Sequence, residues 1–277
     1  MISSMGTLQR TLAPIRGKKR IGLVPTMGAF HEGHLSLIQK AQRECDYAVV
    51  SLFVNPLQFG EAKDFDRYPR DTAADQAWAE RHGVDLLFTP KAEEIVPTDM
   101  DTVVSVPSLS GRWEGVSRPG HFQGVATIVT KLFQLIKPDI AYFGQKDYQQ
   151  VAVIQQLVRD LHFDLKIKVM PTIREKDGLA KSSRNQLLSP EDRAAATVLY
   201  RALYHAKQSV KEGGRDCRIL QKEVELILKK EKRADLDYVA FCDPKTLEPV
   251  NRVTGKTAIL LAVRMGSVRL IDNLIVG

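Results

Sequence analysis

The sequence predicts an α/β protein with a Rossmann-like parallel sheet domain and a smaller C-terminal α+β domain. In the first two-thirds of the 277 residues, short apolar runs alternate with segments of helical periodicity. Such alternation, with strands that are apolar on both sides, is typical of a parallel sheet covered by helices on both faces. Near residue 174 the pattern changes to helices followed by strands. We therefore expect a Rossmann-like domain over residues 1–173 and a smaller α+β domain over 174–277.

The elements of the first domain follow from periodicity. Residues 20–26 are an apolar run that predicts a strand, and residues 35–45 carry apolar side chains at helical spacing. Residues 46–55 are rich in β-branched side chains and predict a buried strand. The remaining predictions are strands over 84–88, 138–143 and 163–170, and helices over 71–82, 124–136 and 146–160.

The C-terminal domain begins with a polar segment, residues 175–189. Ser189 as N-cap and Pro190 at the first helical position predict a helix that ends near the glycines at 213 and 214. The other predictions here are a charged helix over 217–232 and strands over 237–242, 258–264 and 267–274.

Composition limits the class of protein. Hydrophobic residues make up 44% and charged residues 26%, which is ordinary for a soluble globular protein. No run approaches the about 20 apolar residues of a membrane span, and residues 1–20 lack the apolar block of a signal peptide. The three cysteines are far apart, which favours a reducing cytoplasm. The net charge of +7 favours anionic ligands, but the basic residues are too dispersed to predict nucleic acid as a partner.

The strongest local signal is the segment PTMGAFHEGH, residues 25–34, where the first strand turns into a helix. Ligands of open α/β sheets bind at the carboxyl ends of strands, and the free N–H groups of a helix N-terminus suit phosphate. Gly28 and Gly33 would let the backbone approach the ligand, and His31 and His34 could donate hydrogen bonds to phosphate oxygens.

This segment has two other interpretations. A zinc-protease motif needs histidines four apart on a continuous helix, whereas His31 and His34 are three apart and Gly33 weakens the helix. A pair of surface histidines is the plainer alternative. The glycines and the strand-to-helix position favour a phosphate site over both.

Two further segments carry phosphate-binding chemistry. Residues 177–185, DGLAKSSRN, combine hydroxyls with an Arg that can make bidentate contacts to phosphate. Alone, this segment would be an ordinary polar linker; together with residues 25–34 it indicates a mobile clamp over ATP. Gly144, Lys146 and Asp147 follow a predicted strand and open a helix, so they repeat the geometry of the first segment.

Five segments in order resemble one family: residues 25–34, 53–59 (FVNPLQF), 118–125 (RPGHFQGV), 143–150 (FGQKDYQQ) and 182–185 (SSRN). Over nearly the whole chain they resemble the pantoate–β-alanine ligase (pantothenate synthetase) family of the HxGH nucleotidyltransferase superfamily. HxGH alone is a weak signal, whereas five ordered motifs are specific. The sequence departs from the family at Gln145, where Glu is usual, and at Lys181, where Met is usual and the Lys adds a positive charge to the clamp.

The resemblance implies roles for individual residues. It implies that His34 is the catalytic proton donor, with His31, Lys146 and Arg184 as further catalytic residues. The implied ATP-binding residues are Met27, Gly28, Ala29, Phe30, His31, Glu32, Gly33, His34, Gly144, Gln145, Lys146, Asp147, Ile173, Lys181, Ser182, Ser183 and Arg184. Asn55, Gln58 and Gln150 are implied to bind pantoate, and Gln58 also to lie at the β-alanine site. Neutral amides can bind hydroxyl and carboxylate groups without burying another charge, although a simple turn also explains Asn55.

The activity that the resemblance implies is ATP-dependent condensation of (R)-pantoate with β-alanine, through a pantoyl-adenylate, to give pantothenate, AMP and pyrophosphate. It also implies Mg²⁺, no membrane or nucleic-acid partner, and a homodimer formed through the first domain. No carboxylate cluster identifies the Mg²⁺ ligands. The alternatives are a nucleotidyltransferase that acts on a phosphorylated cofactor precursor, an RNA-binding fragment of a tRNA synthetase and a catalytically silent nucleotide-binding protein. Residues 53–59 and 143–150 argue against the first of these.

Overall fold

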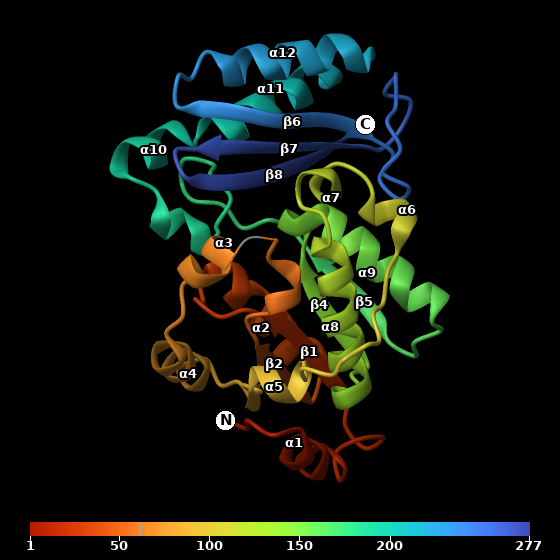
Figure 1. Cartoon of the computed structure of the whole chain (residues 1–277). Coiled ribbons are helices and arrows are strands. Elements are labelled where there is room, and N and C mark those ends of the chain that lie inside the picture. Colours follow the sequence, from red (N-terminus) through yellow and green to blue (C-terminus); the bar gives the residue numbers. More distant parts are fainter. Residues whose placement is uncertain (61) are drawn as a thin grey trace.

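The computed structural model describes residues 1–60 and 62–277 and contains two sheets (Figure 1). The first has five parallel strands in the order β3-β2-β1-β4-β5. This is the strand order of a Rossmann fold, with the order reversing between β1 and β4, so the predicted fold class is confirmed. The strands are β1 (Ile21–Thr26), β2 (Tyr47–Leu52), β3 (Leu86–Phe88), β4 (Ile140–Gly144) and β5 (Lys166–Met170).

Helices cover both faces of this sheet because successive strand residues send apolar side chains to opposite sides. Val24 and Val50 are fully buried on the face covered by α2 (Glu32–Glu44) and α4 (Thr72–Arg81). Leu23 and Val49 are fully buried on the other face. The helices of that face are α1 (Met5–Leu12), α8 (His121–Ile136) and α9 (Tyr148–Asp160).

Helix α1 was not predicted, although it belongs to the core. The Ser4 side chain caps it by accepting a hydrogen bond from the Thr7 N–H, and Leu8 and Leu12 are fully buried. The remaining short elements were also missed: η1 (Pro56–Gln58), α3 (Ala62–Arg67), α5 (Ala92–Ile95), α6 (Pro107–Ser110), α7 (Glu114–Ser117), η2 (Gln145–Asp147) and η3 (Ser183–Leu187). In the ranges that the structure covers, no helix has both the length and the apolar character that crossing a membrane requires.

The C-terminal unit is an antiparallel sheet, β6-β7-β8, with α11 and α12 packed on one face (Figure 1). The single helix predicted from Ser189 is divided in two at Ala196 and Thr197, where the Thr197 hydroxyl donates to the Ala194 carbonyl. The elements are α10 (Pro190–Ala195), α11 (Val198–Lys211), α12 (Cys217–Lys229), β6 (Ala234–Cys242), β7 (Thr257–Met265) and β8 (Val268–Val276).

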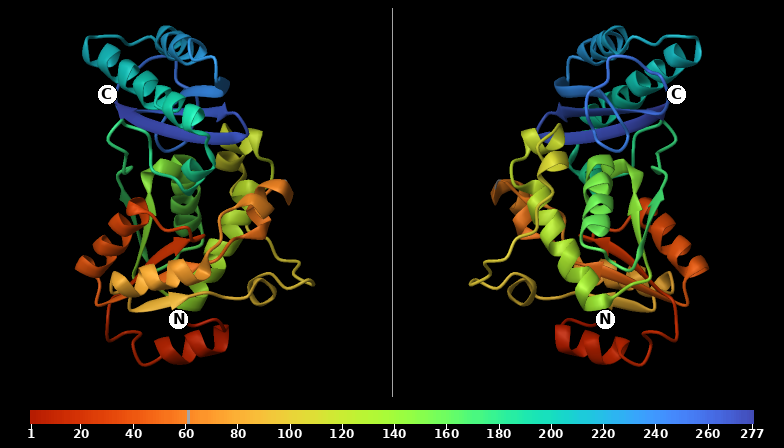
Figure 2. Two further views of the ribbon diagram at one scale, coloured as in Figure 1. Left: turned by 90° about the vertical axis from the view of Figure 1, so that its left-hand side faces the viewer. Right: turned by 90° about the vertical axis from the view of Figure 1, so that its right-hand side faces the viewer.

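The two units are stacked and share buried surface (Figure 2). Ala240 of β6 and Leu260 of β7 belong to the same apolar cluster as the core of the Rossmann-like unit. Trp113 Nε1 donates to the Leu247 carbonyl at 2.9 Å, and the Tyr148 hydroxyl donates to the Pro244 carbonyl at 3.0 Å. The second face of the three-stranded sheet is therefore packed on the first unit.

Replacing a core leucine of α1 tests whether this helix is part of the cooperative fold. We expect Leu12→Ala to lower the free energy of unfolding by about 2–5 kcal/mol, because the cavity left by a fully buried leucine relaxes only in part. Urea denaturation measures the change. Leu161→Ala is the matched control, since Leu161 is 50% exposed, and it should change stability by less than about 0.5 kcal/mol. Equal small effects for both variants would show that α1 does not pack as described.

Candidate active site

A cavity of about 1040 Å³ lies at the carboxyl ends of β1 and β4 and extends to β8. Most of the predicted site residues line it: Met27, His31, Gly33, His34, Asn55, Gln58, Gly144, Lys146, Asp147, Gln150, Ile173, Lys181, Ser182, Ser183 and Arg184. The structure thus brings together segments that are far apart in the sequence. Five predicted ATP-binding residues do not belong to its lining: Gly28, Ala29, Phe30, Glu32 and Gln145.

The loop after β1 is held by a carboxylate from α4. The N–H groups of Ala29 and Phe30 donate to Oδ2 and Oδ1 of Asp75 at 2.8 and 2.9 Å. Gly28 has φ 85°, and a Cβ there would lie 2.6 Å from Asp75 Oδ2. Asp75 therefore occupies these two N–H groups and the space beside Gly28.

The two histidines form a reciprocal cap on α2. His31 Nδ1 accepts from the Gly33 N–H at 3.1 Å, and His34 Nδ1 accepts from the His31 N–H at 3.3 Å. A Cβ on Gly33 would lie 2.7 Å from His31 Cε1, so this glycine makes room for the imidazole. Because each Nδ1 is an acceptor, each neutral ring carries its proton on Nε2.

Burial sets the charge state of these rings. It lowers the pKa of His34 from 6.5 to about 3 and, together with the charge of Lys146, lowers the pKa of His31 to about 4. Both rings are therefore neutral at pH 7, and each can donate one hydrogen bond from Nε2. Transfer of a proton from His34, the role implied by the family, requires a nearby negative charge to raise this pKa.

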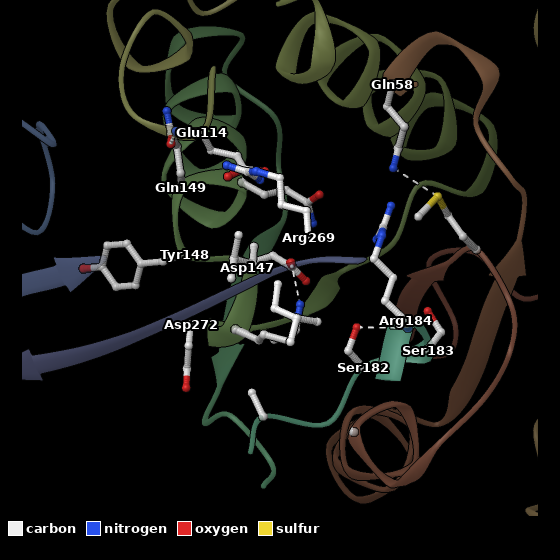
Figure 3. A pocket seen from close by; sticks show the side chains of 18 of the residues that line it. Gln58, Glu114, Asp147, Tyr148, Gln149, Ser182, Ser183, Arg184, Arg269 and Asp272 are labelled. Atoms are coloured by element: carbon white, nitrogen blue, oxygen red, sulfur yellow. Dashed lines mark hydrogen bonds and ion pairs between the residues drawn. The ribbon is translucent and has the colours of Figure 1, made fainter. Parts of the chain in front are cut away.

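The turn η2 places a cation and an anion side by side in the cavity. Lys146 Nζ lies 3.4 Å from Asp147 Oδ1 (Figure 3). Burial opposes ionisation of Asp147, but Lys146 and Arg184 hold its pKa below the usual value, so the carboxyl is ionised. The side chain of Gln145 turns away to the C-terminal unit, where Nε2 donates to Asn273 Oδ1 at 3.3 Å.

The predicted clamp, residues 177–185, contacts the Rossmann-like unit at two places. Lys181 Nζ lies 2.8 Å from Glu32 Oε2 and 3.2 Å from Glu175 Oε2, which raises the pKa of Lys181. Ser183 Oγ lies 3.2 Å from the hydroxyl of Tyr68. The positive charge that Lys181 adds is therefore matched by two carboxylates.

Arg184 extends from the same loop into the cavity, toward the space that Asp147 and Arg269 also face (Figure 3). Its guanidinium carbon lies 5.5 Å from the centroid of the Tyr68 ring. Its backbone N–H donates to Ser182 Oγ at 3.3 Å, which fixes the turn that carries it.

Asn55 and Gln58, both expected to bind pantoate, have different hydrogen-bond partners. Asn55 is 3% exposed; its Oδ1 accepts from the Leu57 N–H, and its Nδ2 donates to Gln58 Oε1 at 3.1 Å and to the Gly124 carbonyl at 3.0 Å. With these bonds Asn55 orients Gln58. The Gln58 amide extends to Met27 Sδ at 3.0 Å (Figure 3).

The backbone of Gln58 is held by Arg118, which follows α7, and by His121, the first residue of α8. Arg118 Nη2 and His121 Nδ1 lie 3.2 and 2.9 Å from the Gln58 carbonyl oxygen. Burial and the charge of Arg118 lower the pKa of His121 to about 3, so this ring is neutral and donates from Nδ1. Both side chains thus hold the backbone of Gln58, which lines the cavity.

The comparison with known families decides the assignment. The family model described as pantoate-beta-alanine ligase matches residues 1–275. The chain belongs to the pantoate–β-alanine ligase family. A pantothenate synthetase of Caldicellulosiruptor saccharolyticus is 52% identical over 258 residues, which are 93% of this chain and 92% of the relative. One of Acetivibrio thermocellus is 48% identical over 98% of both chains.

Solved structures of the pantoate–β-alanine ligase family have the same fold. Pantothenate synthetase from Thermus thermophilus is 46% identical and superimposes with a TM-score of 0.94 over 99% of this chain and 98% of that one. The ligase from Francisella tularensis, described as complexed with beta-gamma ATP and beta-alanine, is 36% identical with a TM-score of 0.83 over 99% of this chain and 97% of that one.

Sequence reasoning missed several side chains around this ligase cavity. Asp75 lies on a helix whose pattern gave no sign of a buried acid, and it is 5% exposed. Arg269 Nη1 lies 2.6 Å from Glu114 Oε1, and both line the cavity (Figure 3). Gln149 is 4% exposed and bonds to the backbone of residues 109–114, and it lines the cavity together with the next residue, Gln150. Within the described residues, no three His, Cys, Asp or Glu side chains are grouped as a metal site.

Replacing one carboxylate oxygen of Asp75 tests its role in holding the loop after β1. Asp75→Asn leaves one loop N–H facing an amide NH₂, and an unsatisfied buried donor costs about 1–3 kcal/mol. We expect the Kd for ATP to rise about tenfold, measured by isothermal titration calorimetry. Asp99→Asn, at an exposed position, is the control and should leave Kd unchanged. An unchanged Kd for Asp75→Asn would mean that the loop is held by other contacts.

The lowered pKa values of His31 and His34 predict a pH-dependent stability. Between pH 6.5 and about 4 the unfolded chain binds more protons at these residues, so the free energy of unfolding falls as the pH falls below 6.5. Above pH 6.5 the contribution is fully present. Urea denaturation at pH 7 and pH 5 should show a smaller loss for the double variant His31→Gln/His34→Gln than for the wild type. An equal loss in both proteins would contradict the assigned pKa values.

Proposed function

We propose that this member of the family condenses (R)-pantoate with β-alanine at the expense of ATP, giving pantothenate, AMP and pyrophosphate through a pantoyl-adenylate. The observation that carries the proposal is one cavity that combines phosphate-binding groups with neutral amides. Lys146 and Arg184 supply positive charge, while Gln58 and Gln150 supply donors and acceptors for a hydroxy acid. Relatives at about half identity carry the name pantothenate synthetase.

In the first step, a carboxylate oxygen of pantoate attacks the α-phosphorus of ATP. The new O–P bond forms as the bond from the α-phosphorus to pyrophosphate breaks, and negative charge grows on the leaving oxygens. Lys146 and Arg184 stabilise this charge, and the Nε2–H groups of His31 and His34 donate to phosphate oxygens. Because η2 and the cap of α2 fix these groups in advance, little reorganisation is needed.

In the second step, the amine of β-alanine attacks the acyl carbon of the adenylate. The C–N bond forms, the bond from the acyl carbon to AMP breaks, and the nitrogen loses a proton. Water competes with the amine, so the intermediate needs a closed cavity. We propose that residues 1–173 bind ATP and pantoate and that residues 174–277 act as the lid, supported by the contacts of Lys181 with Glu32 and of Ser183 with Tyr68.

Mg²⁺ is proposed as the companion of ATP, since it neutralises charge on the phosphate oxygens. Mg²⁺ is usually held by one or two carboxylates together with substrate phosphates. Asp147 fits this need, because it is ionised and lines the cavity beside Lys146. We also propose a cytoplasmic homodimer, for which light scattering is the direct measurement.

Exchange of labelled pyrophosphate into ATP tests the activity. We expect exchange that depends on pantoate and Mg²⁺ and proceeds without β-alanine, because only the first step is reversed. Adding β-alanine should then give AMP and pantothenate. Exchange with a different acid in place of pantoate would reassign the substrate. Absence of exchange with any acid would favour a nucleotidyltransferase that acts on a phosphorylated cofactor precursor.

Removal of a hydrogen-bond donor from the proposed phosphate site has a predicted size. We expect Lys146→Ala and His34→Ala each to lower kcat for pantoate-dependent exchange by about 10²–10³, as for other well-placed charge-stabilising donors. Lys207→Ala removes the same charge from an exposed position on α11 and should leave the rate unchanged. Near-normal exchange by Lys146→Ala would remove Lys146 from the phosphate site.

A further inference from the structure

Strand β8 presents two consecutive buried polar side chains to the cavity. Asp272 and Asn273 are 3% and 2% exposed, and both line it. Neither lies in a segment that carries the resemblance to the family. Each contacts a different segment of the nucleotide site, although both belong to the C-terminal unit.

The side-chain amide of Asn273 forms hydrogen bonds with the turn that carries Lys146. Its Nδ2 donates to the carbonyl oxygens of Gln145 and Lys146 at 2.9 and 2.8 Å, and its Oδ1 accepts from Gln145 Nε2 at 3.3 Å. An amide NH₂ has two donors, and here each one meets one carbonyl. The backbone at Lys146 is therefore fixed by a residue 127 positions away in the sequence.

The neighbouring residue holds the base of the clamp. Asp272 accepts a bidentate pair of bonds from Arg174, at 2.6 and 2.9 Å. Arg174 also donates to the carbonyls of Gly178 and Asn273, and its guanidinium carbon lies 4.4 Å from the centroid of the Tyr200 ring. The dipeptide of Asp272 and Asn273 thus contacts the clamp through Arg174 and contacts the Lys146 turn directly.

We propose that Asn273 is a positioning residue for the phosphate lysine. By holding the carbonyls of Gln145 and Lys146, it sets the backbone from which the Lys146 side chain reaches the phosphates. The C-terminal unit then contributes to the first chemical step, beyond covering the cavity. This inference rests on the proposed function, because Lys146 must act on ATP for its placement to affect the rate.

A double-mutant cycle with Lys146 tests the inference in the pyrophosphate exchange assay. We expect Asn273→Ala to lower kcat about 10- to 100-fold, since a shift of about 1 Å in a catalytic group can cost about 10² in rate. In the Lys146→Ala background, the same substitution should lower kcat by less than about threefold, because the group that it positions is gone. A purely structural role would give losses that multiply in the double variant, and that result would overturn the proposal.

The double-mutant cycle includes a second substitution of Asn273 and a control variant. Asn273→Asp keeps the side-chain volume but has no N–H donor at neutral pH, so it should lose at least as much activity as Asn273→Ala; near-normal kcat would contradict the proposal. If thermal melts show that Asn273→Ala does not fold, Asn273→Asp replaces it in the cycle. Asn251→Ala, at an exposed position of the same unit, is the control. A wild-type protein without exchange would overturn the proposed function itself, whereas multiplying losses in an active enzyme would overturn this inference alone.

Discussion

The pairing of β1 with β4 places the ends of two parallel strands beside each other, and every part of the cavity depends on it. Gly22 pairs with Ile140 and Leu23 with Ala141, so both strands run to the same edge of the sheet. At that edge β1 continues into the histidine cap of α2 and β4 continues into η2. Because the strand order reverses here, the connecting helices leave toward opposite faces and a crevice remains between them.

Several positive side chains in this crevice are paired with carboxylates. The sequence alone indicates that Lys181 strengthens an electropositive clamp, yet Glu32 and Glu175 lie within 3.2 Å of it. The two histidines are neutral because burial disfavours their charged forms. Lys146 and Arg184 are therefore the principal positive groups that the predicted set brings to the cavity, and Asp147 lies beside Lys146.

The sequence predicted the architecture well because the main elements have strong periodicity and clear end signals. It missed α1, whose two core leucines are too few to stand out, and the break between α10 and α11, where the sequence has neither Gly nor Pro. It also predicted which segments meet at the cavity. It assigned Gln150 to the site and missed Gln149, which also lines the cavity, because the bonds of Gln149 to the backbone of residues 109–114 exist only in the folded chain. No pattern in the sequence indicated Asp75, because its partners are backbone N–H groups 46 and 45 residues away.

The hairpin between β7 and β8 has an exposed turn at Gly266 and Ser267, where short insertions would ordinarily be tolerated. Its pairing sets Leu261 opposite Asp272 and Leu260 opposite Asn273. One additional residue in the turn would slide β8 by a single step and send each side chain to the opposite face of the sheet. The bonds to Arg174 and to the Lys146 turn would then be lost together, while the hairpin could still form. Such an insertion would therefore leave a folded protein in which β8 no longer holds Arg174 and the Lys146 turn.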